Sequence, residues 1–327
     1  MATASPRRAS APRALADARN TSLERPDTGR RGQPSPEGTR PYRVLWAYTI
    51  SIVLVHLLAL LALVPWLFSW TGVALCIAGH YVFGMLGVTL GYHRLLTHRG
   101  FKCPKWLEHT LAVLGVCTLQ DTPARWVALH RRHHQHSDEQ PDPHSPLVNF
   151  LWGHIGWLLV VNRETETAEF YDRYARDLLR DPFYLWFERK LRWLWVYVAH
   201  AALFFVAGLA IGWAWTGNAI GGVQFGASLL VWGVLVRTVL VWHVTWSVNS
   251  LSHVWGYRSH ETDDNSRNNW LVALLAHGEG WHNNHHAQQQ AAAHGHRWWE
   301  VDFTWWTVRL MEAVGLARDV VRPKAKP

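Results

Sequence analysis

The chain has 327 residues, of which 49% are apolar, with a formal net charge of +8 and three cysteines. This length allows one large domain or two small ones. Cys76, Cys103 and Cys117 form no C-x-x-C pair, which argues against disulfide frameworks, zinc ribbons and iron–sulfur clusters. The positive charge follows the pattern of a membrane protein along the chain, so we expect no nucleic-acid partner.

The first 42 residues are rich in Pro, Ser, Ala and Arg and show no apolar periodicity. This composition predicts a disordered basic arm over residues 1–42. The arm has no apolar stretch that would serve as a secretory signal. We expect one folded domain over residues 43–320 and a short tail over residues 321–327.

Four apolar segments are long enough to cross a bilayer. They cover about residues 44–64, 71–92, 196–213 and 222–246. The first two and the last two are joined by short connections without Lys or Arg. The sequence therefore predicts an all-α integral membrane protein with four transmembrane helices, arranged as two hairpins.

Basic residues gather in the arm, in the long middle segment and after the fourth apolar segment. The positive-inside rule places these three parts in the cytoplasm. The prediction is a cytosolic helical cap of residues 93–195 and 247–320, with both termini on the same side. The membrane would be the plasma membrane in a bacterium and the endoplasmic reticulum in a eukaryote.

A few polar residues interrupt the apolar segments. Arg237 either faces protein or a wet cavity, or extends its charge toward the cytoplasmic interface. His56, His80, His200 and His243 are isolated, and we interpret them as packed or hydrogen-bonded histidines that bind no metal.

Histidine spacing carries the strongest functional signal. Two stretches have the pattern H-x-x-H-H, whose offsets i, i+3 and i+4 share one face of a helix. Histidine is the commonest protein ligand of transition metals. A wider pair, five residues apart, does not share a helical face and is expected where a helix ends or bends. Eight histidines exceed the needs of one metal, so the pattern predicts two metals; they are His93, His98, His130, His133, His134, His282, His285 and His286.

These residues resemble the histidine boxes of the membrane-bound fatty acid desaturases, specifically the Δ9 acyl-CoA desaturase group. His93 to His98 is similar to the first box, and His130 to His134, followed by Asp-Pro-His-Ser-Pro at 142–146, to the second. The third is Gly278-Glu279-Gly280-Trp281-His282-Asn283-Asn284-His285-His286, and Asn249-Ser250-Leu251-Ser252-His253 resembles a further family element. The resemblance covers about residues 43–318.

The resemblance implies a di-iron centre whose ligands are the eight box histidines and His253. It also implies that Asn249 holds a water on one iron. Glu279 could be mistaken for a general base, but we expect it to orient a ligand histidine, as we do Asp138 and His144. His136 is expected to lie off the ligand face. Gln120, Trp126 and Trp246 are candidates for the wall of a substrate tunnel.

The sequence departs from the animal acyl-CoA members at two points. Their Trp-Ala-Arg-Asp, which is linked to recognition of CoA, is replaced here by Trp126-Val127-Ala128-Leu129, and Asp121 replaces an Asn. The acyl carrier is therefore left open between CoA, a lipid and acyl carrier protein. No haem-binding His-Pro-Gly-Gly motif follows the third box, so a separate donor of the ferredoxin, rubredoxin or cytochrome b5 type, with its reductase, is expected to supply electrons.

The expected reaction is the O2-dependent insertion of a cis double bond, at Δ9, into a saturated acyl chain. Removing hydrogen from an unactivated methylene needs a strongly oxidising metal centre, which two irons, O2 and two external electrons can supply. A related di-iron hydroxylase or alkane monooxygenase is the alternative, and product analysis separates the two. A histidine-rich metal transporter is disfavoured because its ligands would line the spans.

Overall fold

The computed structural model describes residues 32–324, which include only the end of the predicted arm and the start of the predicted tail. Within this range the chain forms helices, turns and isolated β-bridges, without a β-strand. The described part of the chain is therefore all-helical.

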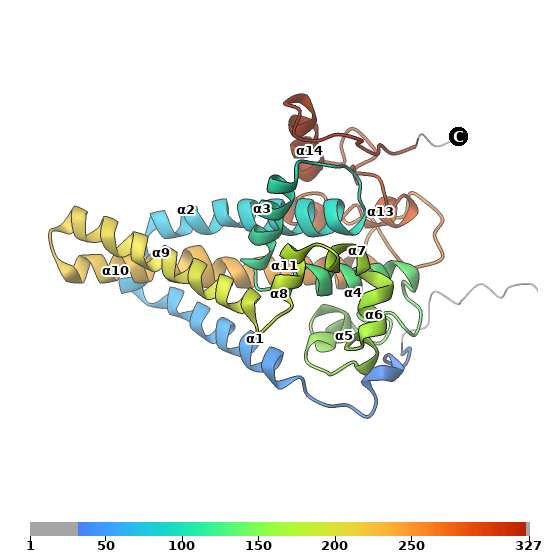
Figure 1. Cartoon of the computed structure of the whole chain (residues 1–327), viewed down its shortest axis with the longest axis horizontal. Helices are drawn as coiled ribbons and strands as arrows, with labels where there is room; N and C mark the ends of the chain where they lie inside the picture. The colour runs from blue at the N-terminus through green and yellow to red at the C-terminus, as the bar shows by residue number, and fades with distance from the viewer. Residues whose placement is uncertain (1–31, 325–327) are drawn as a thin grey trace, which may run out of the picture.

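Four helices are long and apolar enough to cross a membrane. They extend together to one side of the molecule, and the shorter helices gather at the opposite end (Figure 1). Three of these four helices consist of several helical elements that follow one another along the chain. The first joins α1 (Trp46–Ala59) to η2 (Leu60–Leu63), the second joins α2 (Trp70–Gly79) to η4 (His80–Thr97), the third is α9 (Arg192–Thr216), and the fourth joins α10 (Ala219–Leu230), η7 (Val231–Val236), α11 (Arg237–Ser250) and η8 (Leu251–His253).

The hairpin of α9 and α10 is held by small residues. Gly217 ends α9 with φ +71°, in the left-handed region that glycine adopts without strain. Asn218 then caps α10 by accepting a hydrogen bond from the backbone N–H of Gly221. A Cβ on Gly208 would lie 2.8 Å from Cα of Gly226, so the two helices touch through their backbones.

The first hairpin turns at η3 (Pro65–Leu67), and its second helix begins with a cap. Oγ of Ser69 accepts a hydrogen bond of 2.9 Å from the backbone N–H of Gly72. The same hydroxyl lies 2.7 Å from Oγ of Ser228 on α10, which joins the two hairpins at this end of the bundle.

Arg237 is fully buried between the helices. Its guanidinium donates to the carbonyls of Gly233 and Cys117, at 3.2 and 3.1 Å, and lies 4.2 Å from the ring centroid of Phe83. The structure therefore favours the interpretation that Arg237 faces protein, and the side chain does not extend to the interface.

The remaining helices build the cap around the ends of the spans. Its core packs Leu90, Leu111, Ala128, Phe170 and Phe187. The bounds are η1 (Glu37–Thr39), α3 (Lys105–Val116), α4 (Pro123–Gln135), α5 (Phe150–His154), η5 (Gly156–Leu158), η6 (Arg163–Thr165), α6 (Ala168–Tyr174), α7 (Arg176–Leu179), α8 (Pro182–Phe187), α12 (Trp270–Leu275), α13 (His282–Ala287) and α14 (Phe303–Ala313).

Residues 32–42, which the sequence analysis assigned to the arm, pack against this cap. Ser35 and Thr39 are buried, and the backbone of Ser35 accepts a hydrogen bond from Gln140. The packed chain therefore begins before the first candidate span.

Candidate metal centre

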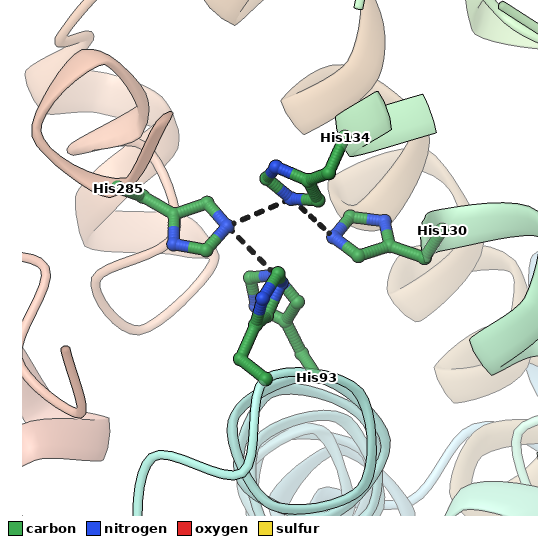
Figure 2. Close-up of side chains that lie close together, drawn as sticks. His93, His130, His134 and His285 are labelled. Carbon is green, nitrogen blue, oxygen red and sulfur yellow. Dashed lines mark hydrogen bonds between the residues drawn. The ribbon is translucent and has the colours of Figure 1, made fainter. Parts of the chain in front are cut away.

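Nine histidines converge in two groups where η4, α4, α13 and the end of the fourth span meet. In each group, one ring nitrogen from every member lies within 4.8 Å of those of the others. Figure 2 shows the convergence of His93, His130, His134 and His285, whose Nε2 atoms are 3.0–3.1 Å apart along the dashed lines. The first group is His93, His98, His130, His134 and His285, and the second is His133, His253, His282 and His286.

Each H-x-x-H-H box is divided between the two groups. His130 and His134 join the first group, while His133 joins the second. On α13 the division is reversed, with His285 in the first group and His282 and His286 in the second. The three histidines of one box lie on one side of the helix, as the spacing predicted, but they do not all reach the same group. At about 100° per residue, i+3 and i+4 lie on opposite flanks of i, and only i and i+4 stay together.

His93 and His98 reach the same group because η4 is wound as a π-helix. A π-helix closes i→i+5 hydrogen bonds, so residues five apart lie over one another. The backbone N–H of His98 donates to the carbonyl of His93 at 3.1 Å, directly after the helix ends at Thr97. The predicted helix end is present, but the assumption that residues at i and i+5 cannot share a face fails here.

Four carboxylates lie behind the histidines and fix their rings. Each places an oxygen against Nδ1 of one imidazole, the usual arrangement behind a metal-bound histidine. The pairs are His93 with Glu279 at 2.5 Å, His133 with Asp142 at 2.9 Å, His253 with Asp138 at 2.8 Å, and His286 with Asp264 at 2.5 Å.

This arrangement fits a cation in each group. A carboxylate only accepts hydrogen bonds, so Nδ1 of His253 and of His286 carries a proton, and in the neutral ring Nε2 presents a lone pair. Burial lowers the pKa of His286, whereas Asp138 outweighs burial and raises the pKa of His253 to about 9, so a metal bound at His253 would displace a proton. Yet both Nε2 atoms face Nε2 of His282, at 3.1 and 3.0 Å. Nε2 of His133 and of His98 is buried without a hydrogen-bond partner among the described residues. A metal ion placed among these lone pairs would satisfy them.

The electrostatics of the site keep most of these rings neutral. Burial and the neighbouring imidazoles lower the pKa of His98, His130, His134 and His285 well below the usual value. Neutral imidazole is the form that binds a metal. The site is therefore prepared for metal ions and poorly suited to proton transfer by these histidines.

Glu279 connects the first group to a buried ionic network. Its Oε1 accepts hydrogen bonds from Nε and Nη2 of the fully buried Arg94, at 3.1 and 2.9 Å. Arg94 also pairs with Asp302 at 3.0 Å. Burial alone would raise the pKa of Glu279, but His294, His93 and Arg94 lower it well below its usual value. The carboxylate is therefore ionised and occupied on both oxygens.

An apolar cavity reaches the metal centre and contains the other residues singled out from the sequence. His93, His130 and His282 form part of its wall. Asn249, Gln120, Trp126, Trp246 and His144 line it as well. The ring of His144 lies 4.3 Å from that of His133, and burial lowers the pKa of His144 to about 3.

His136, as expected, belongs to neither group, and its Nδ1 contacts Glu139 at 3.0 Å. The sequence analysis did not identify Asp264 and His294, which also lie at the site. Asp264 comes from a loop with no recognisable spacing, and His294 stacks on His285 with ring centroids 4.2 Å apart. Neither sits in a box, so no local pattern could have found them.

Residues 68–317 match the family model described as fatty acid desaturase. The chain belongs to the fatty acid desaturase family. It is 41% identical over 291 residues to the sn-2 palmitoyl-lipid 9-desaturase of Nostoc sp. (strain 36), covering 89% of this chain and 95% of the relative. It is 42% identical to the sn-1 stearoyl-lipid 9-desaturase of Anabaena variabilis, covering 86% and 95%. It is also 42% identical to the acyl-CoA C20 Delta5-desaturase of Anemone leveillei, covering 82% and 79%.

This membership confirms the family resemblance found in the sequence, including the similarity to Δ9 desaturases. The protein is an oxidoreductase that desaturates fatty acyl chains. Its histidine groups lie at the wall of an apolar cavity, which is where such a reaction needs a metal.

Proposed function

We propose that this desaturase inserts a cis Δ9 double bond into the acyl chain of a membrane lipid, using two irons, O2 and two electrons from a separate protein. The observation that carries the proposal is the division of nine histidines into two groups beside one apolar cavity. The residues present fit two cations, one in each group. Iron bound there would supply the oxidising power that cleavage of an unactivated C–H bond requires.

The protein's own residues contribute geometry and the exclusion of water. The carboxylates of Glu279, Asp138, Asp142 and Asp264 orient the ligand rings from behind. Trp126 and Trp246 present apolar surface to the acyl chain. In this proposal Asn249 holds a water on one metal from its place on the cavity wall.

The residues near Trp126 favour a lipid over a CoA thioester as the acyl carrier. Ala128 and Leu129 stand where the animal enzymes have Arg and Asp, and both are apolar and buried, so these positions offer no polar contact to a CoA headgroup. Asp121 is already engaged, because Nε of Arg125 lies 3.0 Å from its Oδ2 and the hydroxyl of Tyr48 donates to the same oxygen. Two of the relatives described above are named for lipid substrates, and one is named for acyl-CoA.

In the proposed topology the metal centre and both termini face the cytoplasm, and the cap of residues 93–195 and 247–320 lies on that side. The distribution of Lys and Arg supports this orientation. An electron donor of the ferredoxin, rubredoxin or cytochrome b5 type would then reach the cap from the cytoplasm.

The test is a fatty-acid profile of a desaturase-deficient host that expresses the chain together with a donor system. We expect a new Δ9 monoene on membrane lipids, located by mass spectrometry after derivatisation. His285→Ala should abolish it and lower the iron content, whereas His136→Ala, at a partly exposed site outside every candidate metal group, should leave both unchanged.

Two results would contradict the proposal. Hydroxylated chains in place of monoenes would move the protein to the hydroxylase alternative. Monoenes that form only from added acyl-CoA, in detergent and without lipid turnover, would assign CoA as the carrier.

A further inference from the structure

A second pocket, separate from the apolar cavity, meets the first histidine group from the surface of the cap. It has a volume of about 270 Å³, and His98 and His134 form part of its wall. Its rim is made by three exposed glutamine residues, Gln135, Gln289 and Gln290. No residue of the second group lines this pocket, which we name the outer pocket. A polar opening of the cap therefore approaches the first group and not the second.

The outer pocket is lined by polar residues and carries a small positive excess. Arg131 is the charged residue of its wall, and its guanidinium binds both oxygens of Asp177, at 2.7 and 3.0 Å. The exposed Arg99 pairs with the same carboxylate, so one negative charge faces two positive ones. This excess attracts small anions, among them the chelators that deliver or remove metal ions. The apolar cavity is a poor route for them, because a charged molecule would lose its hydration there without compensation.

The two groups also differ in how firmly their rings are fixed. In the second group, three of the four histidines have a carboxylate oxygen against Nδ1: His133, His253 and His286. In the first group, His93 alone of the five has one among residues 32–324. Nδ1 of His134 is buried without a hydrogen-bond partner in the same range. The rings of the first group are therefore less restrained.

The second group lies deeper in the protein. Its four members are 1–7% exposed, whereas His98 is 9% exposed and His134 is partly exposed. Nε2 of His98 is itself buried, so exchange of a metal in the first group requires a ring to turn outward. The outer pocket gives His98 and His134 space for this movement, which close-packed neighbours would otherwise oppose.

We propose that the outer pocket is the route by which the first group exchanges its metal with anionic chelators, and that the second group exchanges its metal much more slowly. The inference rests on the proposed function, which places one iron in each group. Exchange begins when His98 or His134 turns into the outer pocket and a chelator takes its place. In the second group, the carboxylates behind three of the four rings oppose the same movement.

The experiment follows the release of iron from the purified full chain, loaded with ferrous iron in the absence of O2, to an excess of a coloured anionic ferrous chelator. We expect two phases of equal amplitude, one iron per chain in each, with rates that differ about tenfold or more. Gln290→Trp places an indole ring at the rim of the outer pocket and fills the space that a turning histidine needs. It should slow the fast phase about fivefold or more and leave the slow phase unchanged.

Two further variants complete the test. Ala287→Trp adds the same ring at an exposed position three residues earlier, outside the outer pocket, and should leave both phases unchanged. Asp264→Asn removes the carboxylate that fixes His286. It should speed the slow phase about tenfold and spare the fast one, which assigns the slow phase to the second group.

Release of both irons in a single phase overturns the inference, and so does a fast phase that Gln290→Trp does not slow. If Gln290→Trp fails to hold two irons, Gln289→Trp at the same rim decides by the same criterion. Release needs no turnover, so it is judged apart from the reaction. Two release phases without any monoene in the host would refute the proposed reaction alone, whereas a wild-type chain that holds fewer than two irons would refute both proposals.

Discussion

Oε2 of Glu279 lies 2.5 Å from Nδ1 of His93, while Oε1 of the same carboxylate accepts a hydrogen bond from Arg94. Both oxygens are therefore occupied in holding neighbours. This geometry supports the interpretation that Glu279 orients a ligand and argues against a role as general base.

Replacing Glu279 with Gln should weaken metal binding in the first group. The amide cannot accept a charge-assisted bond from His93 and also balance the buried Arg94. We expect iron affinity or activity to fall about 10- to 100-fold. Iron titration of the purified protein measures this loss. Glu139→Gln, at the acid that contacts His136 outside the centre, is the matched control and should bind iron normally.

Asp264→Asn should affect the second group and spare the first. Oδ2 of Asp264 lies 2.5 Å from Nδ1 of His286, which belongs only to the second group. We expect the iron content to fall from about two toward one per chain in limiting metal, with affinity reduced about 10- to 100-fold. Asp263→Asn changes the exposed neighbouring acid and should leave the stoichiometry unchanged. If Asp264→Asn and Asp263→Asn lost the same amount of iron, the assignment of Asp264 to the second group would be wrong.

The sequence predicted the features of the metal centre that depend on local residue spacing, and it missed those that depend on contacts between distant parts of the chain. The H-x-x-H-H spacing identifies histidines on one side of a helix, and the nine histidines named from the sequence are the ones that gather. Their division into groups depends on how α4 and α13 face each other, which no local spacing encodes. Asp264 reaches His286 across 22 residues of sequence, so it too was beyond a pattern-based analysis.

The sequence also did not reveal that part of the second candidate span, η4, is a π-helix. Apolar content predicted that residues near 71–92 cross the membrane, but it does not distinguish an α-helix from the π-helix of η4. The difference decides whether His93 and His98 share a group. Their interpretation as a pair at a helix end was sound, while the reason why they converge needed the structure.

Gly226→Ala should destabilise the hairpin of α9 and α10. A Cβ on Gly226 would lie 2.6 Å from the carbonyl oxygen of Phe205, which is backbone and cannot rotate away. We expect a loss of about 1–3 kcal/mol, since overpacking forces the helices apart. Thermal unfolding in nanodiscs measures the change. Ala214→Leu adds more volume on the exposed face of α9 and should have little effect; a comparable loss there would argue against close packing as the cause.

Glu188 should make stability depend on pH near neutrality. Burial raises the pKa of Glu188 to about 7 from its ordinary 4.5, and the nearby Asp121 adds to the shift. Because the folded state holds this proton more tightly, the stabilisation is complete below about pH 4.5 and is lost as the pH rises through 7.

Glu188→Gln removes this dependence. We expect the variant and the wild type to unfold with different midpoints at pH 8, where the variant gains on the order of 3 kcal/mol, and with similar midpoints near pH 4.5. A gain that is equal at both pH values would show that the effect does not come from ionisation of Glu188.

The division of each histidine box has a consequence for assembly. Because α4 and α13 each send side chains to both groups, the separation between the two histidine groups depends on the pitch of these helices. The two histidine groups are therefore built by the same two helices. Inserting a single residue within either box would rotate the histidines that follow it by about 100° and would disrupt both histidine groups together.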